Sequence, residues 1–484
     1  MNFMRNIVFS IFCLLLICCG SSEEDKKFPD KQRIVKPEVF YKKRSLQEIK
    51  DSGVLRVSTT YSATSYFLYK GKPMGFEFEL LERFAEHLGV KLEIVVVNNI
   101  NKIIPNLNKG KVDLTAHGLT ITRDRKKDIS FSDYIYLTRQ VLVQKKPDNW
   151  RTMNWKSLEN SLLHDPIELI NDTVSIRIET SYRERINNLS DEMGGTIHID
   201  TLKGDLTTDE IIKMVAKGKI KQTIADDNIA KIVASYYPIL DISVPISFSQ
   251  RIAWATRKDS QDLLDELNRW IKKSKKSVDY YVIYNKYFKN KRDFKRRVKS
   301  DFYSINSNTI SKYDKIIKKE SKNLGWDWRL IASLIYQESR FNPRATSWTG
   351  AGGLMQIMPE TAKELGVKNS KDPSHSIAGG TKYLKVMWDK FEEATDSIQR
   401  QKLAMASYNC GYGHVLDAQK LAKKRGLDKN RWDDNVENVI LDLSHKKHYS
   451  DPVVSYGYVR GTEPYNYVNQ IFERYNHYTE FIKK

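Results

Sequence analysis

The sequence predicts a multidomain protein in which an N-terminal α/β domain is followed by a C-terminal domain that is mainly α-helical. Three observations lead to this prediction. At 484 residues the chain exceeds the usual length of one domain. Up to about residue 290, short runs with a strand pattern alternate with amphipathic helical patterns. Beyond Asn306 the apolar residues recur largely at helical spacing.

Residues 1–18 have the layout of a secretory signal peptide. Arg5 gives a basic start, residues 7–17 are apolar, and small residues follow the two cysteines that come next. The apolar run is too short for a spanning helix with its flanks. Residues 16–19 resemble a bacterial lipobox, in which a small residue precedes the cysteine that receives lipid, so we expect lipidation at Cys19. An uncleaved anchor or a plain signal peptide is the alternative.

Residues 19–45 are rich in Lys, Glu, Asp and Ser, which predicts a lipidated tether. Gly20 rather than Asp follows the lipid cysteine, and the lipobox resemblance then implies sorting to the outer membrane, on its periplasmic face. Cleavage before Cys19 would leave only Cys19 and Cys410, so no internal disulfide is expected. The net charge of +20 favours an anionic partner such as a membrane surface or cell wall. Export argues against nucleic acid.

The α/β domain is predicted at residues 46–292. A strand pattern at Leu55–Ser58 is followed by a helix over Phe76–Leu88 that ends at Gly89, and then by a strand over Leu92–Val97. The alternation continues through residues 103–107, 113–116, 174–178, 211–215 and 223–225.

A basic run from Lys272 to Lys299 closes this domain. One interpretation is that this run binds single-stranded nucleic acid, since basic groups among tyrosines and phenylalanines suit such a strand. Val278, Tyr281, Tyr284 and Phe288 lie near helical spacing, however, which favours a closing helix with a basic face. We expect this helix to run into a basic linker at residues 293–307.

The C-terminal domain is predicted at residues 308–484. Its first helix places Tyr313, Ile316, Ile317 and Leu324 along one face and breaks at Gly325. Asp327 is a candidate N-cap for the next helix.

On that next helix, Ile331, Leu334, Ile335 and Glu338 stand at i, i+3, i+4 and i+7, so a carboxylate ends an otherwise apolar stripe. Burial would raise its pKa, as a general acid near neutral pH requires. Taken alone, the feature would favour a buried structural glutamate.

The residues around Glu338 form a longer motif. It reads Tyr-Gln-Glu-Ser-Arg-Phe-Asn-Pro over residues 336–343, continues with Ala-Thr-Ser at 345–347, and ends with Gly-Ala-Gly-Gly-Leu-Met-Gln-Ile-Met-Pro at 350–359. This motif resembles the signature of the soluble lytic transglycosylase domain, glycoside hydrolase family 23. The resemblance implies a lysozyme-like fold, Glu338 as the catalytic residue, and peptidoglycan glycan strands as the substrate. Its glycines have the physical interpretation of letting backbone approach a sugar chain closely.

Two later blocks extend the resemblance. Residues 406–411 resemble the family's Ala-x-Tyr-Asn-Ala-Gly element, with Cys410 in place of Ala. Residues 463–468 resemble its Glu-Thr-x-x-Tyr-Val element, with Pro464 in place of Thr. The resemblance places five residues in the substrate cleft: Ser347, Gln356, Tyr408, Asn409 and Tyr467.

Most glycosidases use two carboxylates. No Asp or Glu lies between Glu338 and Glu360, and Glu360 after Pro359 is typical of a charge at a helix start. The resemblance implies that Glu338 protonates the oxygen between N-acetylmuramic acid and N-acetylglucosamine, then takes the proton of the muramyl C6 hydroxyl as a 1,6-anhydro ring closes. The resemblance therefore implies a carbon–oxygen lyase that acts on a polysaccharide. No cofactor or metal is expected, since the nine histidines show no zinc spacing.

Residues 75–80, 118–125 and 129–134 resemble the family 3 periplasmic solute-binding proteins, which capture amino acids. The resemblance implies a two-lobed periplasmic-binding-protein-like domain. It assigns the ligand α-carboxylate to Thr120, Arg125 and Ser181, of which Arg125 supplies a guanidinium fork, and the α-amino group to Asp226. Two departures, Glu179 in place of Gly and a second acid after Asp226, leave the ligand open between an amino acid, a muropeptide and none.

Two other functions stay open at this point. The protein would be a solute or muropeptide receptor if the C-terminal domain only anchored it to the wall. It would be a hydrolytic muramidase if water, rather than the C6 hydroxyl, attacked the sugar. The two modules in one chain also suggest that a ligand of the N-terminal module regulates cutting.

Overall fold

The structure is a computed structural model that describes residues 42–483 except 98, 179, 204 and 306. The expected signal peptide, Cys19 and most of the expected tether lie outside the described residues. The described residues belong to one compact unit. Among the described residues, no helix has both the length and the apolar character needed to span a bilayer.

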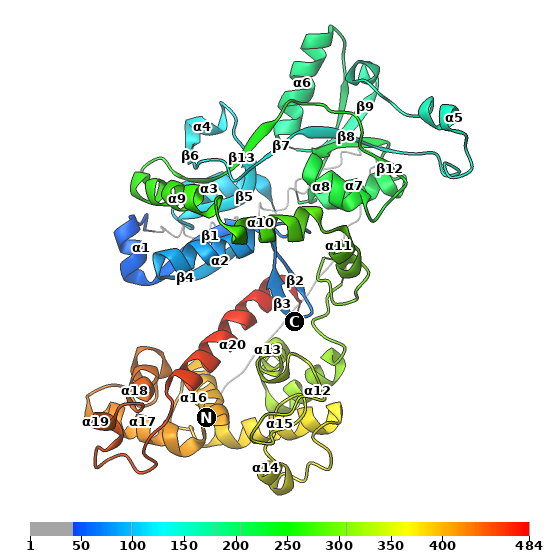
Figure 1. The fold of residues 1–484 in the computed structure, drawn as a ribbon. Coiled ribbons are helices and arrows are strands. Elements are labelled where there is room, and N and C mark those ends of the chain that lie inside the picture. The colour runs from blue at the N-terminus through cyan, green and yellow to red at the C-terminus, as the bar shows by residue number, and fades with distance from the viewer. Residues whose placement is uncertain (1–41, 98, 179, 204, 306, 484) are drawn as a thin grey trace, which may run out of the picture. The chain divides into compact units, whose positions relative to one another are not determined.

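The first lobe of the N-terminal module is built on a six-stranded sheet of order β4-β1-β5-β13-β6, with β7 also paired to β13 (Figure 1). β1 runs parallel to β4 and β5, whereas β13 is antiparallel to β5, β6 and β7. The strands are β1 (Val54–Thr59), β4 (Lys91–Val96), β5 (Leu114–Thr120), β6 (Ile129–Phe131), β7 (Tyr136–Thr138) and β13 (Gln250–Arg257). The helices of this lobe are α1 (Leu46–Ser52), α2 (Phe76–Leu88), α3 (Ile103–Asn108), α4 (Arg125–Asp128) and α9 (Gln261–Ser274).

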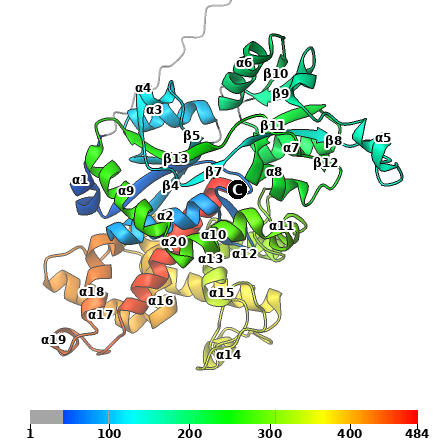
Figure 2. The ribbon, with the colours of Figure 1, turned by 45° about the horizontal axis from the view of Figure 1, so that its top comes forward.

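The second lobe has a three-stranded antiparallel sheet and a parallel strand pair. Figure 2 shows it beside the first lobe. Its strands are β8 (Gln140–Lys145), β9 (Thr173–Arg177), β10 (His198–Leu202), β11 (Gln222–Asp226) and β12 (Leu240–Asp241). Its helices are α5 (Trp155–Glu159), α6 (Ser181–Met193), α7 (Thr208–Ala216) and α8 (Asp227–Ala234). The chain crosses between the lobes from β7 to β8 and again from β12 to β13, which confirms the expected two-lobed domain.

The expected closing helix is present as α10 (Val278–Tyr284), but the prediction of which face is apolar and packed is partly wrong. Tyr280 and Ile283 are buried, whereas Val278 and Tyr281 are exposed. Ser277 caps the helix at its N-terminus, and a π-helical turn over Asn285–Lys289 follows it. A π-helical turn contains more residues than an α-helical turn, so the spacing between residues on one face changes there. A regular helical period therefore did not identify the buried face.

Residues 293–307, expected to be a basic linker, are largely packed. They include the second half of α11 (Lys291–Val298), in which Phe294 and Val298 are buried. Tyr303 is fully buried and pairs with Tyr69 of a small hairpin. The hairpin strands are β2 (Phe67–Tyr69) and β3 (Lys72–Met74).

The C-terminal domain is mainly helical, as expected. Its helices surround a core that includes Ile331, Leu334 and Ile335. Its longest helix, α20, packs across α13 and α16. The helices are α12 (Asp314–Leu324), α13 (Trp328–Ser339), α14 (Pro359–Glu364), α15 (Pro373–Asp389), α16 (Ser397–Cys410), α17 (Tyr412–Lys424), α18 (Glu437–Asp442), α19 (Lys446–Tyr449) and α20 (Thr462–Phe481).

Candidate active site and ligand pocket

Glu338 lies in the last turn of α13, at the end of the buried stripe that the sequence predicts. Asp327 caps the start of this helix by accepting a hydrogen bond from Arg329 N at 2.9 Å. At the other end Arg340 and Phe341 both take positive φ, 49° and 60°, which is uncommon for residues other than glycine. The Ser339 hydroxyl donates to Leu354 O at 2.8 Å. The chain thus reverses sharply and brings the motif loop back against α13.

The carboxyl group of Glu338 has one tyrosine as its hydrogen-bond partner. The Tyr467 hydroxyl on α20 donates to Oε1 of Glu338. Burial raises the pKa of Glu338 to about 7, although the bond from Tyr467 acts to lower it. Burial also raises the pKa of Tyr467 well above its usual value, so the phenol remains a donor. Near neutral pH the carboxyl group is therefore available in both protonation states.

Tyr408 on α16 lies at the same site. Its hydroxyl donates to Met355 O at 2.6 Å, and the pKa of Tyr408 is raised by burial and further by the charge of Glu338. Asn409 is exposed, and its side chain forms no hydrogen bond to any described residue. The structure thus brings Glu338, Tyr408 and Tyr467 together and leaves Asn409 beside them.

Ser347 and Gln356, the other expected sugar contacts, fix the motif loop. The Ser347 hydroxyl accepts from Ala351 N at 2.9 Å. The side-chain amide of Gln356 donates to Ala345 O at 3.1 Å and to Gly353 O at 2.8 Å. These bonds occupy the amide nitrogen of Gln356, and its carbonyl oxygen receives no hydrogen bond from a described residue. Their contact with sugar stays a prediction.

The interpretation that the motif glycines admit a sugar chain is wrong for two of them. A Cβ on Gly353 would lie 1.7 Å from Ser370 O, and one on Gly352 would lie 2.9 Å from Ser370 Oγ. Gly353 also has a φ of +82°. These glycines let the loop pack against the protein's own chain at Ser370, which holds the loop in place beside Glu338.

Trp348 is a candidate that the motif comparison passed over. Its side chain is 98% exposed, and it follows Ser347 at the tip of the hydrogen-bonded loop. A fully exposed indole on a braced loop is a candidate surface for a sugar ring. The signal that could have found Trp348 is a tryptophan inside the motif, directly after Ser347.

A second site lies between the lobes of the N-terminal module, in a pocket with a cavity volume of about 80 Å³. All four residues expected to bind a ligand line it: Thr120, Arg125, Ser181 and Asp226. Ser181 Oγ donates to Thr120 Oγ1 at 3.3 Å, and Arg125 donates to Thr120 O at 3.0 Å. The two lobes therefore supply opposite walls of one polar site.

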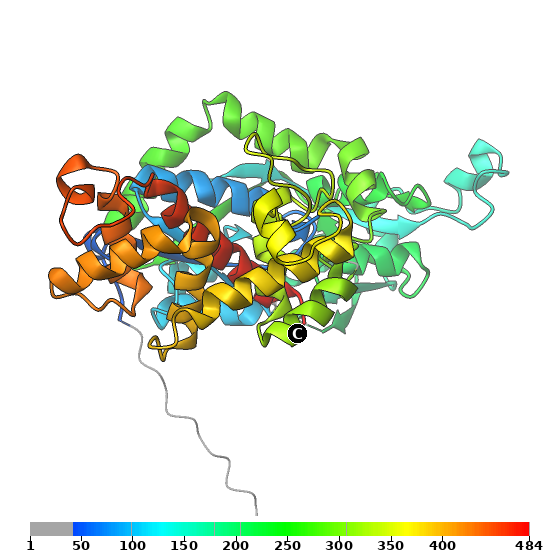
Figure 3. The same ribbon diagram turned by 90° about the horizontal axis from the view of Figure 1, so that it is seen from below.

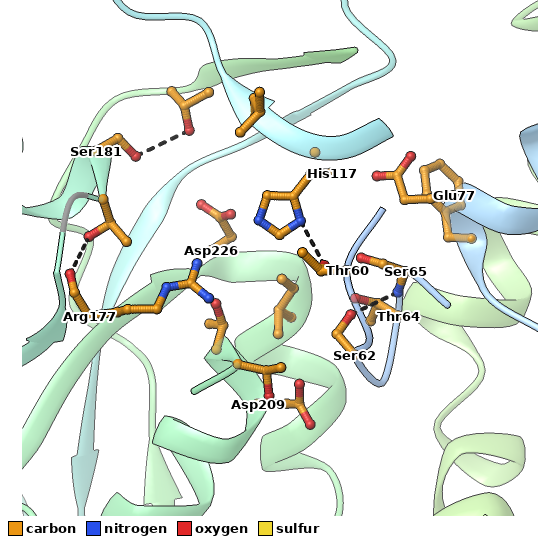
Figure 4. Close-up of a pocket in the computed structure, with 18 of the residues that line it drawn as sticks. Thr60, Ser62, Thr64, Ser65, Glu77, His117, Arg177, Ser181, Asp209 and Asp226 are labelled. Carbon is orange, nitrogen blue, oxygen red and sulfur yellow. Dashed lines mark hydrogen bonds between the residues drawn. The ribbon is translucent and has the colours of Figure 1, made fainter. Parts of the chain in front are cut away.

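His117 and Arg177 are pocket residues that sequence reasoning missed. Figure 4 shows their side chains converging with that of Asp226. His117 Nδ1 forms a hydrogen bond with Thr60 Oγ1 at 2.7 Å, and burial together with nearby arginines lowers its pKa to about 3, so it is neutral. His117 and Arg177 lie on β5 and β9, and the carboxyl ends of strands are where ligands bind in α/β sheets. Strand ends were the signal that could have found Arg177.

Charges in this pocket are buried and only partly satisfied. Burial raises the pKa of Asp226 to about 7 and lowers the pKa of Arg125 from its ordinary value. Asp226 Oδ1 and Arg177 Nε are buried and form no hydrogen bond within the described part of the chain. Such groups favour a ligand that brings both signs of charge. No group of three His, Cys, Asp or Glu residues able to hold a metal ion occurs among the described residues.

Comparisons with known proteins match both modules. Residues 54–290 match the family model "Bacterial extracellular solute-binding proteins, family 3", and residues 315–430 match "Transglycosylase SLT domain". Fold and site together define a peptidoglycan lytic transglycosylase that carries a solute-binding-like N-terminal module. The chain belongs to the family of membrane-bound lytic murein transglycosylase F.

The relatives match along most of their length. Membrane-bound lytic murein transglycosylase F of Desulfosudis oleivorans is 36% identical over 433 residues, which cover 90% of this chain and 91% of the relative. The protein of the same name from Photobacterium profundum is 33% identical over 472 residues, covering 97% and 85%. Among solved structures, holo ArgBP from T. maritima is 28% identical with a TM-score of 0.40, covering 49% of this chain and 97% of ArgBP.

Proposed function

We propose that Glu338 alone serves as acid and then as base in cutting the β-1,4 bond between N-acetylmuramic acid and N-acetylglucosamine. The observation that carries the proposal is a desolvated carboxyl group, with a pKa raised to about 7, that is held by the Tyr467 hydroxyl. Burial and Tyr467 account for its pKa shift, and no second carboxylate among the described residues contributes to it.

In the first step, protonated Glu338 gives its proton to the glycosidic oxygen. The bond from that oxygen to the muramyl C1 breaks, and the electron pair leaves with the oxygen. Charge then develops on the sugar as an oxocarbenium-like state. The hydrogen bond from Tyr467 stabilises the carboxylate that Glu338 has become.

In the second step, the Glu338 carboxylate takes the proton of the muramyl C6 hydroxyl, and the C6 oxygen bonds to C1. The product carries a 1,6-anhydromuramyl end, Glu338 is protonated again, and no water is consumed. We assign Ser347, Gln356, Tyr408 and Asn409 to contacts with the glycan. The carbonyl oxygen of Gln356 suits a sugar hydroxyl, because its amide nitrogen is already engaged.

Replacing Tyr467 by Phe tests the pairing. Glu338 must be protonated to act, so activity is present below its pKa of about 7 and is lost as pH rises through that value. Removal of the bond that lowers this pKa should move the alkaline limb of the kcat profile upward by about one to two pH units. Tyr475→Phe, on the same helix, is the control. An unmoved limb in Tyr467→Phe would show that the bond does not tune Glu338.

For the N-terminal module we propose a zwitterionic ligand, either an amino acid or a muropeptide. Arg125, with Thr120 and Ser181, would hold its carboxylate, and Asp226 its amino group. Support comes from the clustering of these residues in one pocket and from the unpartnered Oδ1 of Asp226. Occupancy of this pocket would regulate cutting by the C-terminal domain.

Arg125→Lys should weaken binding of the ligand about 10- to 100-fold, because an ammonium cannot reproduce a guanidinium fork. Calorimetric titration with free amino acids and with purified muropeptides measures the effect. Arg123→Lys, an exposed arginine two residues earlier, is the matched control. Equal losses in both variants would mean that Arg125 contributes only charge.

We further propose that Cys19 carries lipid and holds the protein at the periplasmic face of the outer membrane. Support comes from the lipobox and from relatives that are named as membrane-bound. The module boundaries that go with this proposal are 46–292 for the solute-binding-like domain and 308–484 for the catalytic domain.

A further inference from the structure

Helix α10 leaves an apolar ridge in solvent. Val278, Tyr281 and Val282 are 78%, 55% and 57% exposed. They stand at i, i+3 and i+4 and so share one face of the helix. The opposite face, with Tyr280 and Ile283, is buried against the module. The packing of the domain therefore does not use the side chains of this ridge.

The segments on both sides of this ridge in the sequence are strongly basic. Residues 269–299 contain 13 Lys and Arg but only two Asp, more than half of the chain's net charge of +20. Both acids are engaged, Asp279 with Arg83 at 3.0 Å and Asp293 with Arg296 at 2.9 Å. Figure 3 shows the three green helices α9, α10 and α11 following one another along one edge of the ribbon.

Most of the cations are exposed and available to an outside partner. Within the described part of the chain, eight of the exposed cations have no carboxylate at salt-bridge distance. They are Lys272, Lys273, Lys276, Lys289, Lys291, Arg292, Lys295 and Lys299. Together with Val278, Tyr281 and Val282, these eight residues define the α10 surface.

The N-terminal segment joins the module about one helix length away from α10. Lys43 Nζ contacts Asp259 at 3.2 Å, and Leu46 N donates to Asp262 Oδ2 at 2.6 Å, so this segment enters beside the start of α9. The 14 residues of α9 then span about 21 Å toward α10. A chain of the length between Cys19 and Lys42 reaches at most about 80 Å. A lipid at Cys19 therefore permits α10 to touch the membrane.

We propose that the α10 surface docks on anionic phospholipid headgroups of the leaflet that holds the lipid anchor, an inference that rests on the proposed anchor at Cys19. The lysines and arginines would meet the phosphates, while Val278, Tyr281 and Val282 enter the boundary between headgroups and acyl chains. A tyrosine suits this boundary because its ring is apolar and its hydroxyl is polar. A polysaccharide or a nucleic acid would match the charge but would leave the aliphatic ridge in water.

The test uses the lipidated full-length chain with Cys410→Ala, so that a cysteine introduced at position 282 is the only free thiol. Val282→Cys is labelled with an environment-sensitive fluorophore, and the protein is reconstituted in vesicles of phosphatidylethanolamine with either phosphatidylglycerol or phosphatidylcholine. The phosphatidylglycerol vesicles should give a blue-shifted emission that spin-labelled acyl chains quench. Phe248→Cys, at a residue that is 92% exposed in the native protein, should stay in water in both vesicles.

The second part of the test reverses the charge of three lysines in the α10 surface. Combining Lys272→Glu, Lys273→Glu and Lys276→Glu should abolish the blue shift at position 282 while the lipid anchor keeps the protein on the vesicles in flotation. Digestion of peptidoglycan by the same labelled samples in detergent reports on Glu338 separately.

Three results would overturn the proposal. If the protein floats with both kinds of vesicle while the fluorophore at position 282 stays in water, docking of the α10 surface is wrong and the lipid anchor stands. Loss of co-flotation in the native chain would reject the anchor and the surface together. A shift produced by isolated peptidoglycan but not by vesicles would assign the α10 surface to the wall.

Discussion

Glu338→Gln should lower kcat for cutting peptidoglycan by about 10⁴-fold, at the upper end of what one acid–base group contributes, because in the proposed mechanism this side chain serves both halves of the reaction. An amide keeps the shape of the carboxyl group and can still accept a hydrogen bond from Tyr467. Binding to peptidoglycan sacculi should therefore persist. Glu360→Gln, at the exposed start of α14, is the control and should cut normally. Near-native cutting by Glu338→Gln would place the acid elsewhere.

The same variant should be more stable than the native protein at alkaline pH. Burial raises the pKa of Glu338 from 4.5 to about 7, so the charged form is disfavoured in the folded state. The contribution of this group to the free energy of unfolding is therefore fully present below about pH 4.5 and is lost as pH rises through 7. At pH 8, Glu338→Gln should gain up to about 3 kcal/mol in free energy of unfolding, and at pH 4 almost nothing. Urea unfolding at both pH values measures the difference, and a loss at pH 8 would mean that Glu338 supports the fold.

Gly353→Ala should destabilise the C-terminal domain by about 3 to 5 kcal/mol and remove activity with it. The new Cβ would lie 1.7 Å from Ser370 O, a backbone atom, and alanine is strained at a φ of +82°. The motif loop would have to move away from Glu338. Urea unfolding and a cutting assay report the two effects.

Gly366→Ala separates the two causes. Gly366 has a φ of +71°, but nothing lies within 4 Å of its added Cβ. It should cost only about 1 kcal/mol, which is the backbone strain without the collision. Equal losses in Gly353→Ala and Gly366→Ala would show that contact with Ser370 does not hold the loop.

Local patterns predicted the elements closely where the controlling interactions are local. α2 spans Phe76–Leu88 as expected, because the apolar spacing is regular and Gly89 ends the helix in the left-handed conformation. α13 starts after Asp327 as expected, because an N-cap acts within a few residues. The buried stripe that leads to Glu338 follows from the same helical period.

What depended on distant contacts was not predictable in this way. The buried face of α10 follows from what packs against it, and the π-helical turn at Asn285–Lys289 has no marker in the pattern. The family motif named both Glu338 and Tyr467, yet their hydrogen bond joins residues 129 positions apart. His117 and Arg177 enter the pocket only because β5 and β9 end on its opposite sides.

The most direct test of a single acid–base group is digestion of peptidoglycan in H₂¹⁸O with mass spectrometry of the new muramyl ends. If the C6 hydroxyl of the same sugar closes the ring while Glu338 takes its proton, the ends are 1,6-anhydro and contain no ¹⁸O. Reducing ends labelled with ¹⁸O would show that water is the nucleophile, and the two-step role of Glu338 would be wrong.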